Sequence, residues 1–146
     1  MRRVSLILLL LLPAFTSCGD DYKSSIPDVK VNFSCSLVQN PYYIIQTDGQ
    51  FIPVAQDSHY LPIGYAGLII GRSIYGDYCA YDAACPVEAK RSVAVEVQED
   101  GLGTAVCPVC GTKYNLSEGG FPQKKGGEYL KRYKVTVNGT TLRVSN

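Results

Sequence analysis

The sequence of 146 residues predicts an all-β fold, an antiparallel sandwich or barrel, on two observations. Short apolar segments alternate with Gly, Pro, Asn and Asp turn signals along nearly the whole chain after Pro27. No segment beyond the N-terminus keeps the apolar period of about 3.6 residues that an amphipathic helix needs. The length suits one domain with a modest core.

The first residues have the features of an export signal. Arg2 and Arg3 give a basic start, and the leucine-rich run 5–12 is too short to span a bilayer as a helix. Thr16-Ser17-Cys18 follows. Small residues before a cysteine resemble the processing site of bacterial lipoproteins, in which the cysteine becomes the lipidated first residue. We therefore expect Cys18 to carry lipid.

This expectation divides the chain into a signal peptide (1–17), a lipidated cysteine with a polar tether (18–27) and a β domain (28–146). The protein would then be exported as an outer-membrane lipoprotein that faces the periplasm or the cell surface. Its expected membrane contact is the lipid anchor, because more than one acyl chain gives stable anchoring.

Charge excludes one class of partner. Loss of the signal peptide removes two of the 14 basic residues and none of the 13 acidic ones, which leaves a net charge of −1. A near-neutral chain without charge clusters has no electrostatic footprint for nucleic acid. The sequence identifies no protein partner.

The expected strands follow one another along the mature chain. They are 29–35, 42–46, 51–54, 67–72, 78–81, 92–97, 104–106, and a C-terminal hairpin from 133 to 144. The run 67–72 is continuously apolar, which is typical of a strand buried on both faces. Asp48-Gly49 predicts a hairpin between the second and third segments, and Asn138-Gly139 predicts a type I′ turn in the last hairpin.

Two loops share a pattern that the rest of the chain lacks. Cys85-Pro86 and Cys107-Pro108 each follow a short apolar strand, in the segments 81–88 and 105–116. A fold that brings these loops together would place Cys85, Cys107 and Cys110 side by side. These three cysteines are the candidate metal ligands, and also the candidates for a disulfide.

The two loops resemble the cluster-binding loops of a Rieske [2Fe–2S] domain, which read Cys-x-His and Cys-x2-His. Gly111 after the second ligand position and Tyr114-Asn115-Leu116 extend the likeness, which covers about 63–144. The resemblance implies a two-loop site subdomain on a larger antiparallel base, and an electron carrier at most rather than an enzyme. Both histidines are missing, because Val87 and Cys110 occupy their positions.

The occupant of the site stays open between three alternatives. An orthodox Rieske cluster is excluded, since His59 is the only histidine and lies outside both loops. The leading expectation is a non-catalytic scaffold without cofactor, in which a disulfide joins Cys85 to Cys107 or Cys110, as an oxidising compartment favours. The alternatives are a non-orthodox 2Fe-2S cluster with an unspecified fourth ligand, and zinc, for which Cys107-Pro108-Val109-Cys110-Gly111 has the form of a zinc knuckle.

The remaining candidates for chemistry are weak. Cys35 and Cys79 lie within predicted strands, where a free cysteine acts as a small apolar side chain. Cys107-x2-Cys110 lacks the following helix that activates a thioredoxin-like thiol. His59, beside Asp57 in a loop, does not make a catalytic triad. The sequence therefore predicts no enzyme.

Overall fold

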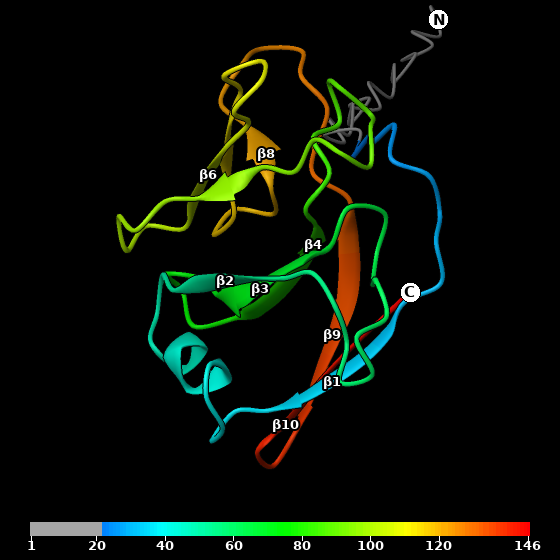
Figure 1. The fold of residues 1–146 in the computed structure, drawn as a ribbon. Helices are drawn as coiled ribbons and strands as arrows, with labels where there is room; N and C mark the ends of the chain where they lie inside the picture. Colours follow the sequence, from blue (N-terminus) through cyan, green and yellow to red (C-terminus); the bar gives the residue numbers. More distant parts are fainter. Residues whose placement is uncertain (1–21) are drawn as a thin grey trace, which may run out of the picture.

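The fold is described by a computed structural model over residues 22–146, so the predicted signal peptide and Cys18 lie outside the described residues. The all-β prediction is confirmed, because the described chain forms two antiparallel sheets (Figure 1). The larger sheet has the order β1 (Asn32–Ser36), β10 (Thr141–Ser145), β9 (Arg132–Asn138), β4 (Tyr78–Asp82), β3 (Leu68–Arg72) and β2 (Phe51–Val54). The smaller sheet has the order β5 (Glu96–Val97), β6 (Thr104–Val106), β7 (Lys113–Asn115) and β8 (Phe121–Pro122).

Two hydrophobic cores share the central strands β3 and β4. Leu68 and Ile70 of β3 face the core of the larger sheet, whereas Ile69 between them faces the core under the smaller sheet. All three side chains are fully buried, as the apolar run 67–72 predicted. Since successive residues of a strand point to opposite faces, β3 joins the two halves of the molecule.

The C-terminal hairpin lies in the middle of the larger sheet, where β10 pairs with both β1 and β9. Leu142 and Val144 are fully buried, as expected. The predicted turn is wrong in one detail, because Asn138 pairs with Thr141 and the loop residues are Gly139 and Thr140. Of these two loop residues, only Gly139 has a positive φ, of 58°. A type I′ turn needs a positive φ at both loop residues and a type II′ turn needs it only at the first, so the turn fits type II′.

The expected strand 42–46 is wrong: Tyr42–Gln46 forms η1, a 3-10 helix. Its amides bond locally, with Ile44 N–H donating to the carbonyl of Pro41 and Thr47 N–H to that of Ile44. A short apolar run fits either structure, and here Ile45 alone is fully buried. The predicted hairpin at Asp48-Gly49 is therefore a turn from a helix into β2.

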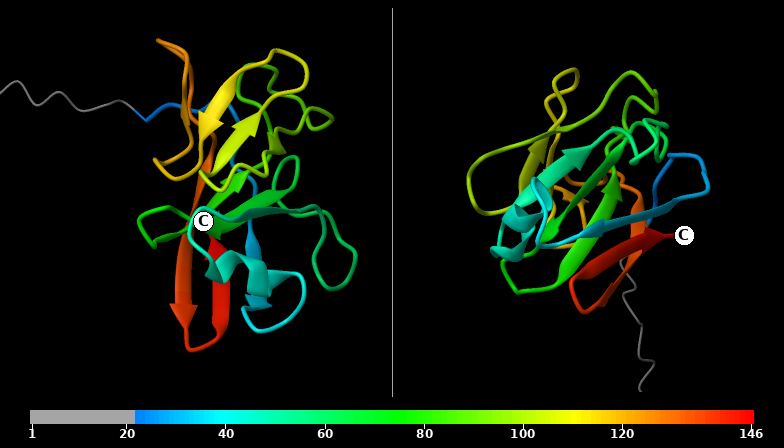
Figure 2. Two further views of the ribbon diagram at one scale, coloured as in Figure 1. Left: turned by 90° about the vertical axis from the view of Figure 1, so that its left-hand side faces the viewer. Right: turned by 60° about the horizontal axis from the view of Figure 1, so that its bottom comes forward.

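Part of the expected tether is attached to the domain. Tyr129 N–H donates to the carbonyl of Lys23 at 2.8 Å, and Ser25 N–H donates to the Glu128 carboxylate at 2.6 Å. Ile26 is buried with 2% of its surface exposed. In Figure 2 this N-terminal segment (blue) runs beside the chain that follows β8 (orange). Residues 22–27 are thus fastened to the segment 128–132.

Among residues 22–146, the structure contains no helix with the length and apolar character of a membrane span.

Candidate metal centre

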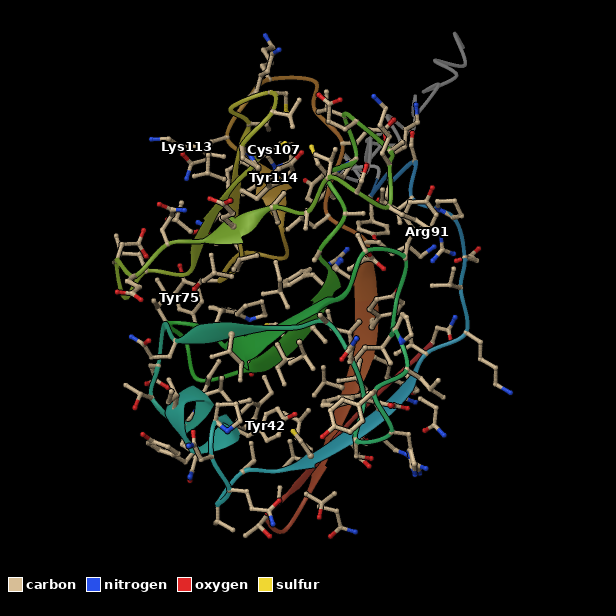
Figure 3. All side chains as sticks on the ribbon, viewed as in Figure 1. Tyr42, Tyr75, Arg91, Cys107, Lys113 and Tyr114 are labelled. Atoms are coloured by element: carbon tan, nitrogen blue, oxygen red, sulfur yellow. The ribbon has the colours of Figure 1, made fainter. Side chains whose placement is uncertain are left out.

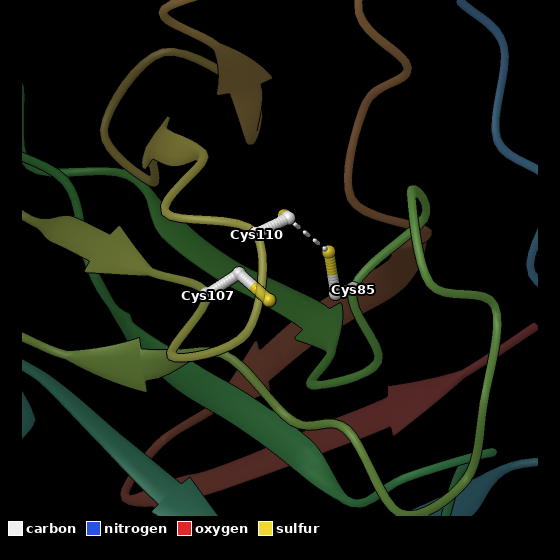
Figure 4. Close-up of side chains that lie close together, drawn as sticks. All are labelled: Cys85, Cys107 and Cys110. Carbon is white, nitrogen blue, oxygen red and sulfur yellow. Dashed lines mark hydrogen bonds between the residues drawn. The ribbon is translucent and has the colours of Figure 1, made fainter.

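The structure brings the three cysteines of the two loops together. Their sulfur atoms all lie within 4.8 Å of one another, and the Sγ atoms of Cys85 and Cys110 are 3.7 Å apart. Figure 4 shows the three side chains pointing toward one another from the two loops. Cys85 and Cys107 are fully buried, whereas Cys110 is exposed. The group therefore lies near the surface of the half of the molecule that contains the smaller sheet, which is the upper half in Figure 1, and one of its three residues is exposed to solvent.

A buried carboxylate holds the first loop. Asp82, at the end of β4, is fully buried and accepts hydrogen bonds from the amides of Ala66 (3.0 Å) and Ala84 (2.9 Å). It also accepts from the Tyr65 amide and from the Tyr133 hydroxyl, the latter at 2.9 Å. Four donors satisfy a charge whose burial would otherwise be costly. Asp82 thereby fixes the chain three residues before Cys85.

The segment 93–95 supports the same loop from its other side. Cys85 N–H donates to the Val93 carbonyl at 3.0 Å, and Val95 N–H donates to the Ala83 carbonyl at 2.8 Å. The strand expected over 92–97 is therefore shorter than predicted, since only Glu96–Val97 forms β5 and residues 93–95 pair with the cysteine loop instead.

The second loop is a tight turn between β6 and β7. Cys107 N–H donates to the Thr112 carbonyl at 2.9 Å, and Gly111 N–H donates to the Cys107 carbonyl at 2.9 Å. Gly111 adopts a φ of 70°, a conformation that glycine reaches without steric cost. The turn places Cys107 and Cys110 on the same side of the hairpin.

Hydrogen-bond donors surround the sulfur atoms of this turn. Burial raises the pKa of Cys107 to about 11, and the amides of Cys110 and Val109 act in the opposite direction by bonding to its sulfur. Burial also disfavours the Cys110 thiolate, but hydrogen bonds with the Thr112 hydroxyl and amide, together with those with Cys107 and Cys85, outweigh burial and lower the pKa of Cys110. The Thr112 Oγ1 atom is 3.2 Å from the Cys110 sulfur. Such donors stabilise negative charge on sulfur.

Tyr114 completes the surroundings of the third sulfur. Its hydroxyl oxygen is 3.5 Å from the Cys85 Sγ atom, and its ring is fully buried behind the loops. Burial is the main cause that raises the pKa of Tyr114, so the phenol stays protonated and can donate to a thiolate. Figure 3 shows Tyr114 beside Cys107 in the upper half, far from Tyr42 in the lower half. Each of the three sulfurs thus has a donor in reach.

An orthodox Rieske cluster does not fit these residues. It needs two imidazoles on one iron, whereas Val87 at one position offers only hydrocarbon and is 56% exposed. Cys110 at the other position is turned toward Cys85. His59 lies in an exposed loop, where its ring contacts Ser58 and Asp57. Among the residues that the structure describes, no other His, Cys, Asp or Glu joins the group of three sulfurs.

The sulfur spacing suits a single ion. Zinc binds thiolates at about 2.3 Å in a tetrahedron, which places its sulfur ligands about 3.8 Å apart. Cys85 and Cys110 already have this separation, at 3.7 Å. A disulfide needs about 2.05 Å between its sulfurs. The five cysteines of the described chain are all free thiols in this structure.

The other two described cysteines lie outside the site. Cys35 of β1 is buried in the core of the larger sheet, where burial raises its pKa to about 11, and Cys79 of β4 is half-buried. Sequence reasoning missed Asp82 and Thr112. A charged residue directly after the apolar residues of β4 was the available signal for Asp82, and Thr112 carried none.

Comparison with known proteins gives likenesses of structure alone. No protein-family model matches the sequence, and no curated relative matches it. The ferredoxin of carbazole 1,9a-dioxygenase from Nocardioides aromaticivorans IC177 is similar at 17% identity and a TM-score of 0.46, over 81% of this chain and 98% of that one.

A chain assigned as the small subunit of an NADH-dependent nitrite reductase from Mycobacterium tuberculosis is similar at 15% identity and a TM-score of 0.47, over 82% of this chain and 97% of that one. A chain from a complex of reduced oxygenase and oxidized ferredoxin in carbazole 1,9a-dioxygenase reaches 0.48 at 16% identity, over 82% and 94% of the two chains. What the site of this chain can hold follows from its own side chains.

Proposed function

We propose that the protein is a non-catalytic, membrane-anchored domain that binds one thiophilic metal ion through Cys85, Cys107 and Cys110, and that this ion is zinc. The observation that carries the proposal is the convergence of three sulfurs within 4.8 Å, two of them at the spacing of a zinc–thiolate tetrahedron. A bound ion would link the two loops and so stabilise the upper half of the domain.

The surroundings of the sulfurs support binding as thiolates. Metal-bound cysteines are deprotonated, and hydrogen-bond donors to their sulfurs stabilise the charge and orient the ligands. Here the Tyr114 hydroxyl serves Cys85, and backbone amides serve Cys107. A disulfide would use two sulfurs and leave the third one, with its donors, without a role.

Zinc suits this ligand set better than a 2Fe-2S cluster. A cluster needs two protein ligands on each of its irons, and the described residues offer three ligand atoms. A zinc ion with three protein ligands keeps one coordination position for water or another ligand, as open zinc sites do. That position would lie on the side of the exposed Cys110.

We also propose that the domain is held close to the outer membrane through lipidated Cys18. Three residues, Gly19 to Asp21, separate this cysteine from Tyr22. Tyr22 is attached to the domain, because its hydroxyl accepts from the Arg132 amide at 2.7 Å and its ring lies 4.3 Å from the Arg132 guanidinium carbon. Four residue steps span no more than about 14 Å, which keeps this part of the domain near the bilayer surface.

The metal content of one air-free preparation tests the site. The full chain is purified from membranes without air and without added reductant, and zinc, iron, acid-labile sulfide and free thiols are measured on the same sample. We expect about one zinc per chain, and loss of zinc when Cys85, Cys107 or Cys110 is replaced by Ala. Cys79→Ala serves as the matched control and should retain the metal.

Two results would contradict the proposal. Stoichiometric iron with acid-labile sulfide would indicate a cluster and an electron carrier. Protein without metal that has two of the three thiols blocked would indicate the disulfide scaffold.

A further inference from the structure

We propose that the cysteine triad is a site of oxidative modification: an oxidant joins Cys85 to Cys110 as a disulfide, the bound ion is released, and Cys107 stays a thiol. The inference rests on the proposed metal site for the release step, and on the geometry of the three sulfurs for the choice of pair. It makes the binding of the ion dependent on the redox state of the surroundings.

The geometry of the thiols favours Cys85 and Cys110. Their sulfurs are 3.7 Å apart, so they must approach by about 1.7 Å to reach a disulfide bond. Cys85 cannot move far, because its amide is bonded to the Val93 carbonyl and the preceding chain is fixed by Asp82. Cys110 is exposed at the tip of its turn, next to the exposed Val109, so it can supply the movement.

The access of an oxidant favours the same pair. Cys110 is the exposed member of the group, whereas Cys85 and Cys107 are fully buried. A reagent from solvent therefore meets the Cys110 sulfur first. For the second step, the buried sulfur of Cys85 on the other loop lies 3.7 Å away.

Cys107 is the member left over. Its sulfur accepts hydrogen bonds from the amides of Val109 and Cys110 within its own turn. Its amide and carbonyl close that turn through Thr112 and Gly111. A bridge from Cys107 to Cys110 would have to form inside this closed turn, and a bridge from Cys107 to Cys85 would join two sulfurs that solvent does not reach.

With hydrogen peroxide as the oxidant, the chemistry balances. The Cys110 thiolate attacks one peroxide oxygen, the O–O bond breaks, and the products are a Cys110 sulfenic acid and hydroxide. The Cys85 thiolate then attacks the Cys110 sulfur, an S–S bond forms, and the S–O bond breaks to release a second hydroxide. The two sulfurs lose two electrons in total, and the peroxide oxygens gain them. Three protons from solvent convert both hydroxides to water and Cys107 to a thiol.

Formation of the disulfide would leave a bound ion with one sulfur ligand of three. The charge of the ion would not change, because both electrons come from the two sulfurs. Metal binding depends on the full set of three deprotonated cysteines, so the loss of two thiolates to the disulfide would abolish the site. Reduction of the disulfide by a dithiol would restore the three thiols and the site. The two loops stay joined in both states, by the ion or by the disulfide.

The test uses the zinc-loaded full chain in the Cys79→Ala background. Trypsin cleaves after Arg72, Lys90, Arg91 and Lys113, so the peptide 73–90 then contains Cys85 as its only cysteine, and 92–113 contains Cys107 and Cys110. One equivalent of hydrogen peroxide is added, free thiols are alkylated, released zinc is measured with a chromogenic chelator, and the joined peptides are fragmented. We expect about one zinc released per disulfide formed, with the alkyl group on Cys107.

Variants separate the alternatives. In the same background, Cys107→Ala should still form the bridge from Cys85, whereas Cys110→Ala should oxidise at least tenfold more slowly. Cys35→Ala is the control and should behave as the parent chain does. A bridge that contains Cys107, or zinc that stays bound after the bridge has formed, would overturn the inference.

The experiment distinguishes failure of the proposed disulfide pairing from failure of the proposed metal site. If the reduced chain holds no metal, the proposed function fails, and the pairing is then read from the same peptides of the metal-free protein. If the reduced chain holds zinc but the oxidised sample joins 107 to 110, the metal site stands and the inference fails.

Discussion

At the scale of single residues, the site depends on side chains that are not ligands. Thr112 and Tyr114 place hydroxyl groups 3.2 Å and 3.5 Å from the sulfurs of Cys110 and Cys85. Asp82 touches no sulfur, yet its four hydrogen bonds fix the chain that leads to Cys85. The sequence of the two loops determines which residues are the candidate ligands. These supporting contacts determine where the ligand atoms lie.

Tyr114→Phe removes one hydroxyl and keeps the ring that fills the core. Because the loss of a hydrogen-bond donor to a metal ligand weakens metal binding by about 10–100-fold, we expect at least about tenfold weaker zinc binding. The free energy of unfolding of the metal-free protein should fall by about 1 kcal/mol or less. Competition with a chelator of known affinity measures the first effect and thermal unfolding the second.

Tyr81→Phe is the matched control for that variant. The Tyr81 hydroxyl is also buried, but it donates to the Leu116 carbonyl at 2.7 Å. Its loss should lower stability by about 1 kcal/mol and leave zinc affinity unchanged. Equal zinc affinity in both variants would show that the Tyr114 hydroxyl has no role in binding.

Asp82→Asn replaces the buried carboxylate with an amide that also carries donors. At least one of the four donors around it would lose its acceptor, so we expect a loss of about 2–3 kcal/mol in the free energy of unfolding, with weaker zinc binding as the first loop loosens. Urea unfolding of the reduced protein measures this loss. Asp77→Asn, at an exposed position directly before β4, should change stability by less than about 0.5 kcal/mol. An Asp82 variant as stable as this control would argue against a role for the carboxylate.

At the scale of elements, β3 and β4 connect the larger sheet to the site. β3 is buried on both faces, and β4 runs from the larger sheet directly into the first cysteine loop. Ile69 and Tyr81 carry the packing of these strands into the upper core, where Cys85 and Cys107 are also buried. The two loops are therefore held on the same packed support as the larger sheet.

Truncation of the C-terminal hairpin tests how much the stability of the larger sheet depends on one strand. Truncation after Asn138 removes β10, and with it Leu142 and Val144, which are both fully buried. Each such side chain contributes about 2–5 kcal/mol, which together is comparable to the whole stability of a small domain. We expect no cooperative unfolding transition in the truncated protein. Circular dichroism during heating measures it, and an unchanged melting curve would contradict the prediction.

At the scale of the whole molecule, the N-terminal segment relates the site to the proposed anchor. Residues 22–27 lie against 128–132, in the half of the molecule that also carries the smaller sheet (Figure 2). If Cys18 is lipidated, three residues separate the lipid from the attached segment, which holds this half of the domain closer to the bilayer than a long tether does.

Cys18→Ala should release the protein from the membrane fraction. The reason is that the proposed lipid supplies the hydrophobic contact with the bilayer. Fractionation after a carbonate wash measures the change, with Cys35→Ala as the control that should stay with membranes. A Cys18 variant that still sediments with membranes would place the anchor elsewhere.

The sequence by itself determined the fold class and most of the strands. Alternating and continuous apolar runs located β2, β3, β4 and β6, because side-chain periodicity reflects which face of a strand is buried. The repeated Cys-Pro pattern singled out the two loops that hold Cys85, Cys107 and Cys110. It could not tell η1 from a strand, since a run of five residues is compatible with both.

Only the tertiary structure decided how the three sulfurs are arranged. Their separations depend on the Asp82 hydrogen bonds, on the pairing of 93–95 with the first loop, and on the Gly111 turn. Asp82 thereby contacts Tyr65 and Tyr133, which are far from it in the sequence. Hydrophobic periodicity carries no information about such contacts, nor about the geometry of a turn. The same holds for the N-terminal segment, whose polar composition predicted a tether. Hydrogen bonds with 128–132, which involve Lys23, Ser25 and Tyr22, fasten it to the domain, and hydrophobic periodicity does not encode them.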